Sequence, residues 1–368
     1  MPPFTAETFN AERLDIFYRN TLARYGNVIF TGGGELIRAL ATLFRLSGDT
    51  RCSQRIYLCE MGETEIMCRL YDRLPADNTV LVILSRKFDE MELLALSLAY
   101  SAWPQVFLAP THGPLAEGAR LLRIPFFPVD LAFNRFWYNS ELFHLPLTTL
   151  GHEPEAISEG FIQGYRECID GSRTVAGILR TMEKQGCWRV FFLSRNPFFR
   201  LIVEILTPLL EESSTGEKCR LYYRVLSPDT LKEHYLDELC RNPAETLCLW
   251  LDEGQRPAGP QISFPEILRE NSYLDSRFFA LQGKPFSGLA CAESESLRAF
   301  LVEKRMTVVA LSGFREDDES LGGLLAFFQL LACFNAWLRG VDLFNDPSRV
   351  EADGKAWDHF FWNIGVPG

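Results

Sequence analysis

The chain has 368 residues, 47% of them hydrophobic, and a formal net charge of −11 at pH 7. This length is ample for two medium-sized α/β domains, and the acidic balance argues against nucleic acid or an anionic membrane as partner, because both select basic surfaces. No stretch approaches the ~20 uninterrupted apolar residues of a membrane span, and the first residues lack the features of a secretory signal. We therefore expect a cytoplasmic protein with no membrane partner.

The first part of the chain alternates short apolar runs with amphipathic stretches. This alternation predicts a mainly parallel sheet covered by helices on both faces. The expected strands are 27–30, 55–60, 79–85, 105–110 and 124–129, and the expected helices are 11–25, 35–46, 62–74 and 88–102. A linker is expected over 147–156.

A second round of the same plan follows the linker. The expected strands are 188–194, 220–227 and 246–252, the expected helices are 154–185, 197–214 and 229–239, and the stretches 277–282, 294–305 and 306–313 complete the round. The shared plan predicts an internal structural duplication, with one domain over 1–150, a second over 151–315, and a C-terminal helix and arm over 316–368. The apolar run 320–340 predicts a buried helix.

Ten cysteines are scattered along the chain. None stands in a C-x-x-C pair or in a Cys/His spacing suited to zinc. We read them as free thiols, mostly buried, in a reducing compartment. The sequence therefore predicts no metal site, and it suggests no cofactor.

The turn after the expected strand 79–85 raises a question of charge. A helix N-terminus presents free N–H groups and positive dipole, which suit a phosphate. Here, however, Asp89 and Glu90 stand at the start of the helix, separated by one residue from Arg86 and Lys87. The two carboxylates either repel a phosphate at this turn or simply cap the helix N-terminus, where negative charge is favourable.

The end of the chain resembles a known family. Residues 340–355, GVDLFNDPSRVEADGK, are similar to the segment G-x-N-x-F-D-Q-x-G-V-E that precedes the catalytic lysine of phosphoglucose isomerases. Further motifs of that family are matched in order by FTGGG at 30–34, SRKFDEMEL at 85–93, FNRFW at 133–137, VEILTPLLEES at 203–213 and RNPAET at 241–246. The resemblance covers roughly residues 27–360.

The resemblance implies a fold and an activity. The fold is α/β, with two sugar-isomerase (SIS) domains, each a flavodoxin-like three-layer α/β/α sandwich with a parallel sheet, followed by a C-terminal helical arm. The activity is that of glucose-6-phosphate isomerase, in which a hexose phosphate passes between aldose and ketose through an enediol in glycolysis and gluconeogenesis. A homodimer and a small sugar or sugar phosphate as ligand are implied with it.

The resemblance also assigns catalytic residues. It makes Glu212 the general base, Arg135 the charge that stabilises the enediolate, and Lys355 the group that assists ring opening. Each has a plainer interpretation. Glu212 would be an exposed charge at a helix end, Arg135 a structural arginine paired with a nearby carboxylate, and Lys355 a solvated lysine.

Ligand binding falls on two further groups of residues. The matched phosphate-binding segments contain Gly32, Gly33, Gly34, Ser85, Arg86 and Lys87. The family's catalytic histidine falls on Thr230, and His234 lies one helical turn further on the same face. His234 either partly replaces the lost histidine or is a plain surface residue.

Departures from the family pattern keep other functions open. Gly34 stands where the family has serine, and Asp89 and Glu90 replace paired threonines, so we expect a weak phosphate site and an impaired activity. One rival is a non-catalytic relative that binds a sugar derivative or regulates. Another is an enzyme whose ligand is uncharged or amino-bearing at the end where phosphate would lie.

Overall fold

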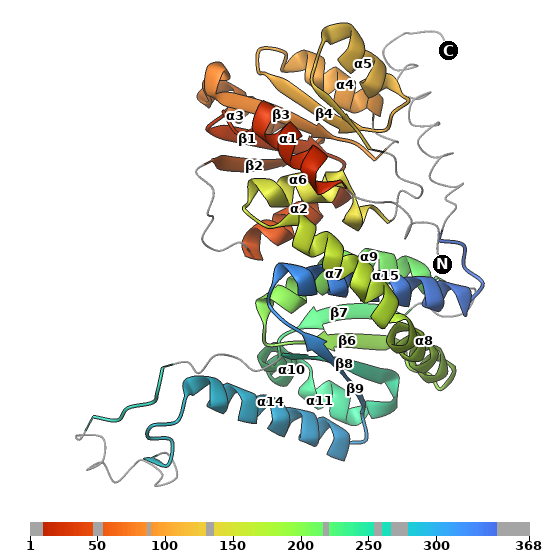
Figure 1. The fold of residues 1–368 in the computed structure, drawn as a ribbon. Coiled ribbons are helices and arrows are strands. Elements are labelled where there is room, and N and C mark those ends of the chain that lie inside the picture. Colours follow the sequence, from red (N-terminus) through yellow and green to blue (C-terminus); the bar gives the residue numbers. More distant parts are fainter. Residues whose placement is uncertain are drawn as a thin grey trace. The chain divides into compact units, whose positions relative to one another are not determined.

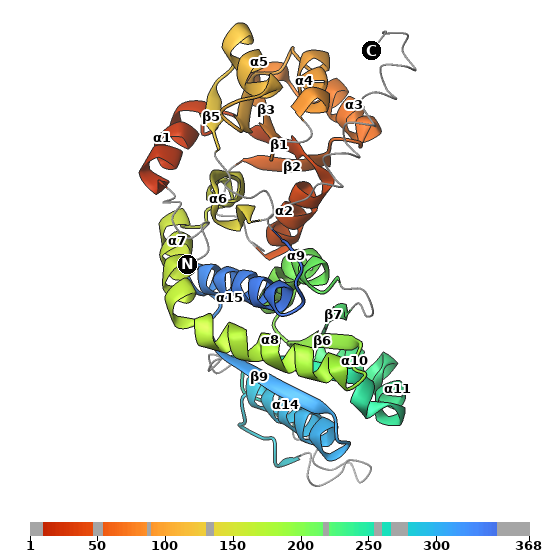
Figure 2. The ribbon, with the colours of Figure 1, turned by 90° about the vertical axis from the view of Figure 1, so that its right-hand side faces the viewer.

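The computed structural model describes residues 10–46, 54–86, 90–129, 136–215, 221–253, 260–265 and 279–343. These residues form two compact units, each built on one parallel sheet (Figures 1 and 2). The first unit takes the described parts of Met1–Gly177, Ile205–Gly216 and Asp317–Gly368, and the second takes those of Ile178–Glu204 and Glu217–Glu316. This division differs from the expected boundaries, because residues 151–177 and the apolar helix at 318–337 belong with the first sheet.

The first unit contains a five-stranded parallel sheet in the order β2-β1-β3-β4-β5. The strands are β1 (Asn27–Gly32), β2 (Arg55–Glu60), β3 (Thr79–Leu84), β4 (Gln105–Ala109) and β5 (Phe126–Pro128). Strands β1, β3 and β4 are buried along their whole length, as expected for a parallel sheet with both faces covered. This sheet confirms the strands expected from the sequence.

Helices cover the first sheet and extend its unit. They are α1 (Ala11–Thr21), α2 (Gly34–Leu46), α3 (Thr64–Arg73), α4 (Glu90–Ala99), α5 (Pro114–Leu122), α6 (Glu141–Thr149), α7 (Pro154–Glu167) and α15 (Asp318–Trp337), with short 3₁₀ turns η2 (Ala76–Asn78) and η3 (Trp137–Asn139). Sequence reasoning did not expect α5 or α6. The linker expected over 147–156 is reduced to the four residues between α6 and α7, because the apolar residues of α6 are buried almost all round.

Helices α7 and α15 pack closely within the first unit. A Cβ atom on Gly160 would overlap the Glu319 carbonyl oxygen, and one on Gly322 would overlap that of Ile157. Only glycine permits this approach of two helix backbones. Helix α15 is long and apolar enough to cross a membrane, but 72% of that stretch is buried inside the structure, which confirms the expected buried helix.

The second unit repeats the plan with four parallel strands in the order β7-β6-β8-β9. The strands are β6 (Arg189–Leu193), β7 (Tyr222–Leu226), β8 (Thr246–Glu253) and β9 (Thr307–Phe314), and the helices of this unit are α10 (Pro228–His234), α11 (Leu236–Arg241) and α14 (Phe286–Glu303), with the 3₁₀ turn η4 (Pro243–Glu245). Helices α8 (Ile169–Lys184) and α9 (Pro197–Ser213) contribute residues to both units. The order second-first-third-fourth matches that of β2-β1-β3-β4, so the expected duplication and the α/β fold class are confirmed.

Candidate functional site

The strands of the first sheet end at one edge, where α/β sheets bind their ligands. The register places Gly32, at the end of β1, opposite Glu60 of β2 and Leu84 of β3. Ser85 and Arg86 follow β3 directly. The structure thus brings the predicted residues Gly32, Gly33, Gly34, Ser85 and Arg86 to the same edge, whereas Lys87 lies outside the described residues.

Two glycines at this edge have close neighbours, the backbone of β3 at Gly32 and charged side chains at Gly34. A Cβ on Gly32 would lie 2.5 Å from the Leu84 carbonyl oxygen. A Cβ on Gly34 would lie 2.6 Å from Glu60 Oε2 and 3.2 Å from Arg38 Nη1. The carboxylate of Glu60, which pairs with Arg38 at 3.4 Å, therefore takes the space that a serine side chain at position 34 would need.

Arg86 is held by groups of its own unit. Its side chain is only 10% exposed, and Nη2 donates a hydrogen bond of 2.8 Å to Oε2 of Glu35 in the first turn of α2. The guanidinium carbon also lies 5.7 Å from the centroid of the Trp137 ring, within the range of a cation–π interaction. The positive charge of Arg86 is therefore balanced inside the chain.

Two aromatic residues of η3 pack beside Arg86. Trp137 and Tyr138 are buried, and their ring centroids lie 4.5 Å apart. The Tyr138 hydroxyl donates to the Ile205 carbonyl oxygen of α9 at 3.3 Å. Trp137 Nε1, in contrast, has no hydrogen-bond partner within the described ranges. These rings join the strand edge to the α9 helix inside the first unit.

Three charged groups act on the Tyr138 hydroxyl. Burial raises the pKa of Tyr138 far above its ordinary value, the carboxylates of Glu35 and Glu212 raise it further, and the Arg86 guanidinium lowers it. Electrostatic influence of this kind requires proximity. Glu35, Arg86 and Glu212 therefore each lie close enough to Tyr138 to act on its pKa.

The end of α9 that carries Glu212 is fixed by α15. Ser213 and Ser214 are buried, and Nδ2 of Asn335 donates to both hydroxyl oxygens at 2.8 Å. Asn335 is itself buried and accepts a hydrogen bond from Arg339. The backbone around Glu212 is consequently held in place by a buried polar network, which favours a defined position for its carboxylate.

Glu90 is the first residue of α4, as the sequence analysis expected, but its carboxylate binds a different helix. Its carboxylate is buried, and Oε2 accepts a hydrogen bond of 3.2 Å from the backbone N–H of Leu115 in the first turn of α5. Glu90 therefore caps a neighbouring helix, where a negative charge is favourable. Asp89 lies outside the described residues. The carboxylates at the strand edge are instead Glu35 and Glu60, which sequence reasoning missed although each stands at the end of an expected strand or directly after its turn.

The remaining predicted residues divide into two groups. Arg135 and Lys355 lie outside the described residues. Thr230 and His234 both lie on α10 of the second unit, as expected. The backbone N–H of Thr230 donates to the Ser227 hydroxyl, which caps α10, whereas the side chain of His234 is 67% exposed beside Glu233. A functional role for either residue stays a prediction.

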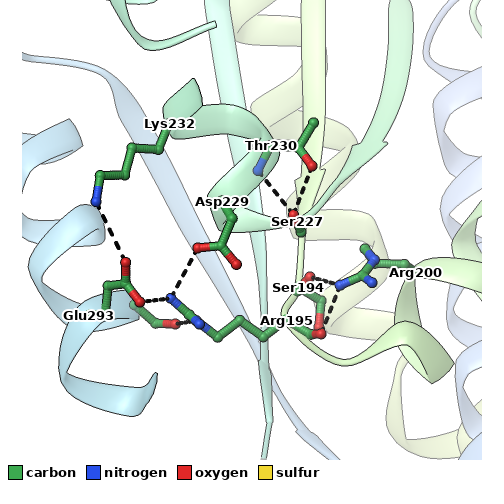
Figure 3. A network of polar contacts seen from close by, with 9 residues as sticks. Ser194, Arg195, Arg200, Ser227, Asp229, Thr230, Lys232 and Glu293 are labelled. Atoms are coloured by element: carbon green, nitrogen blue, oxygen red, sulfur yellow. Dashed lines mark hydrogen bonds and ion pairs between the residues drawn. The ribbon is translucent and has the colours of Figure 1, made fainter. Parts of the chain in front are cut away.

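The corresponding edge of the second sheet carries a polar network around Arg195 (Figure 3). Arg195 Nη2 contacts Glu293 at 2.6 Å and Asp229 at 3.5 Å, and Nε donates to the Ser294 hydroxyl at 2.6 Å. Lys232 also pairs with Glu293, at 3.6 Å. Arg195 thus links the loop after β6 to α10 and α14.

Metal ligands are not grouped in the part of the chain that the structure describes. No set of three or more His, Cys, Asp or Glu side chains there is arranged to hold a metal ion. The eight described cysteines are free thiols. Burial raises the pKa of Cys59 to about 11, with a further contribution from Glu63, so this thiol is protonated and inert at neutral pH.

Comparisons with known proteins show the fold. No protein-family model and no curated protein matches the sequence. A hypothetical protein from Thermus thermophilus has a similar structure, with a TM-score of 0.73 and 20% identity over 95% of this chain and 86% of that one. A glucose-6-phosphate isomerase from Chlamydia trachomatis is also similar, with a TM-score of 0.67 and 15% identity over 97% of this chain and 74% of that one.

A third solved structure extends the likeness. Glucosamine-6-phosphate deaminase from Thermotoga maritima gives a TM-score of 0.51 and 15% identity, over 92% of this chain and 94% of that one. Identities this low bear on the fold alone. The likenesses confirm the expected α/β fold with two parallel sheets.

Proposed function

We propose that the chain binds a sugar or sugar derivative at the edge of the first sheet and interconverts its aldose and ketose forms, with Glu212 as the base. The observation that supports this most is the packing of Arg86 against Trp137, whose neighbour Tyr138 donates a hydrogen bond to the Ile205 carbonyl oxygen of α9, the helix that carries Glu212. These contacts join the helix that carries Glu212 to the edge of the first sheet, the usual ligand site of such sheets. The names of two structural neighbours, a glucose-6-phosphate isomerase and a glucosamine-6-phosphate deaminase, agree with a sugar ligand.

The reaction requires a base and a compensating positive charge. A carboxylate within hydrogen-bond reach of the sugar removes a proton from C2 and returns it to C1, and positive charge stabilises the enediolate oxygens that form meanwhile. Glu212 supplies the base in this proposal. The roles of Arg135 at the enediolate and of Lys355 in ring opening, like the homodimer and the place in glycolysis, rest on the resemblance alone.

A second candidate function is binding without turnover. In sugar-phosphate isomerases a phosphate clamp contributes remote binding energy that positions the reacting carbons. Arg86 is a described cation at the strand edge that would supply such a clamp, yet it is paired with Glu35 and packed against Trp137. This observation favours a relative that binds a sugar derivative and regulates.

Proton exchange at the sugar separates the two candidates. The purified chain is incubated in D₂O with glucose, fructose, glucosamine and the two hexose 6-phosphates, and deuterium entry at C1 or C2 is followed by NMR. We expect exchange with at least one sugar and a loss of at least about 100-fold in the Glu212→Gln variant. The matched control is Glu211→Gln, which removes the neighbouring carboxylate and should leave exchange unchanged. Binding without exchange would support the second candidate, and full exchange in Glu212→Gln would refute Glu212 as base.

A further inference from the structure

We propose that the edge of the first sheet holds carboxylates of its own chain where a ligand phosphate would lie, so that its ligand is uncharged or cationic at that end. The substrate class is then a free sugar or an amino sugar rather than a sugar phosphate. This inference rests on the proposed function and names the substrate class of the same site.

The first carboxylate is that of Glu35. It stands in the first turn of α2, directly after the glycine turn, and forms a 2.8 Å ion pair with Arg86. A phosphate bound at the N-terminus of α2 would approach this carboxylate and compete with it for the same guanidinium. Glu35 is thus already paired with Arg86, the cation that an anionic ligand would need.

The second carboxylate is that of Glu60. Its Oε2 atom lies in the space above Gly34 that a side chain at this position would fill, and its charge is paired with Arg38. In the family that the chain resembles, a serine occupies position 34. Here the hydroxyl donor is absent and a carboxylate takes its place, and a carboxylate accepts hydrogen bonds but donates none.

The carboxylate acceptors at this edge suit a neutral or cationic group. Sugar hydroxyls can donate to the oxygens of Glu35 and Glu60, and an ammonium group can do the same with a favourable charge. A phosphate dianion can only accept hydrogen bonds, and it meets two carboxylates at this edge. Glu90 takes no part in this exclusion, because its carboxylate caps α5.

Inorganic phosphate is the direct probe of this charge arrangement. Its affinity for the wild type and for the variants Glu35→Gln and Glu60→Gln is measured by calorimetry, with Glu65→Gln as the control that removes one exposed carboxylate on α3 of the same unit. We expect at most weak binding by the wild type and by the control, and an affinity at least about tenfold higher in each edge variant. If loss of Glu35 unfolds the protein, Glu60→Gln decides alone, with the rise of its melting temperature in phosphate as a second readout.

Two results would overturn the inference. One is an absence of any gain in phosphate affinity in the folded edge variants. The other is tighter binding of fructose 6-phosphate than of fructose by the wild type, reduced by Arg86→Gln. The second result would leave the proposed function standing. A wild type that binds no sugar at all would end the proposed function. The phosphate measurements would then still decide whether the carboxylates exclude a phosphate dianion from this edge.

Discussion

The two sheets share a strand order, but the arginine at the carboxyl edge of each sheet has different surroundings. At the first edge, Arg86 is almost fully buried and is paired with Glu35 and an aromatic ring. At the second edge, Arg195 is 18% exposed in its side chain and links Asp229 to Glu293. The first arrangement gathers charge around a bare glycine turn, and the second ties two helices to a loop.

The strand ends show the same divergence. Gly32 is the last residue of β1, whereas Leu193 is the last residue of β6. After β6 the N-terminus of α9 is closed by Asn196, whose Oδ1 accepts from the Phe198 N–H and whose Nδ2 donates to Glu316. A side chain thus satisfies the groups that would receive an anion there. Under the proposed function, the duplicated fold keeps a ligand edge on the first sheet, whereas the second edge is taken up by structural contacts.

The largest expected effect on stability comes from a side chain placed at the glycine that ends β1. Gly32→Ala places a Cβ 2.5 Å from the Leu84 carbonyl oxygen, so strands β1 and β3 must shift, at a cost of about 3 kcal/mol in the free energy of unfolding. The control is Gly62→Ala, because nothing lies within 4 Å of a Cβ at that position. Urea denaturation measures both, and equal stability of the two variants would show that the first edge tolerates side chains as the second does.

The next effect concerns the histidines of the two units. Burial lowers the pKa of His144 in the first unit to about 3, so the native state holds it neutral while the unfolded chain takes up a proton below its ordinary value of 6.5. The stability from this group is complete above pH 6.5 and is lost as pH falls towards 3, by about 2 kcal/mol at pH 5.

Urea denaturation at pH 7 and pH 5 tests this sign. The variant His144→Gln should lose less stability between these pH values than the wild type. His234→Gln removes the exposed histidine of the second unit and should leave the difference unchanged. A wild type whose stability is equal at both pH values would contradict the account of His144.

A smaller difference separates the two arginine partners. Glu35→Gln leaves the buried Arg86 without its ion pair and should cost about 1–2 kcal/mol, less than a fully buried pair because Glu35 is partly exposed. Glu293→Gln should cost below about 1 kcal/mol, since Arg195 keeps Asp229 and Ser294. Denaturation curves of the two variants rank these costs, and the reverse ranking would make the second edge the more tightly bound charge site.

The smallest expected effect is the acid response of Glu293. Its hydrogen bond to Arg195, and then the charge of Arg195, lower the pKa of this carboxyl. The stability from the pair is therefore present above the ordinary value of 4.5 and is lost as pH falls through the lowered value. For so exposed a group we expect a few tenths of a kcal/mol. Below pH 4.5 the free energy of unfolding of Glu293→Gln should fall slightly less steeply with decreasing pH than that of the wild type. A steeper fall in the variant would contradict the pairing.

Much of the fold followed from the sequence. The strand at 55–60 was predicted to the residue and that of 79–84 within one, because parallel strands buried on both faces appear as short apolar runs. Helix α6 was missed because its apolar residues show no helical period and Pro146 suggests a loop. Helix α5 follows Gly113 and begins with Pro114, a pair that indicates a turn as much as a helix start.

The site was less accessible to sequence reasoning. The resemblance brought Arg86 and Glu212 into one hypothesis, but no local pattern links residues so far apart. The pairing of Glu35 with Arg86 joins positions 51 residues apart and depends on the register of β1 against β3. The direction of Glu90 was decided by α5, a helix that the sequence analysis had not expected.

Hydrogen exchange with a bound sugar tests the central claim most directly. The full chain is labelled with and without a saturating free sugar, and peptides are compared by mass spectrometry. The account predicts added protection at the first edge, in peptides that contain Gly32 to Glu35, Ser85 and Arg86, and Glu212 to Ser214, with none at Ser194 to Asn196 or Ser227 to Thr230. Protection confined to the second edge, or none at either edge under conditions of measured binding, would contradict the placement of the ligand site on the first sheet.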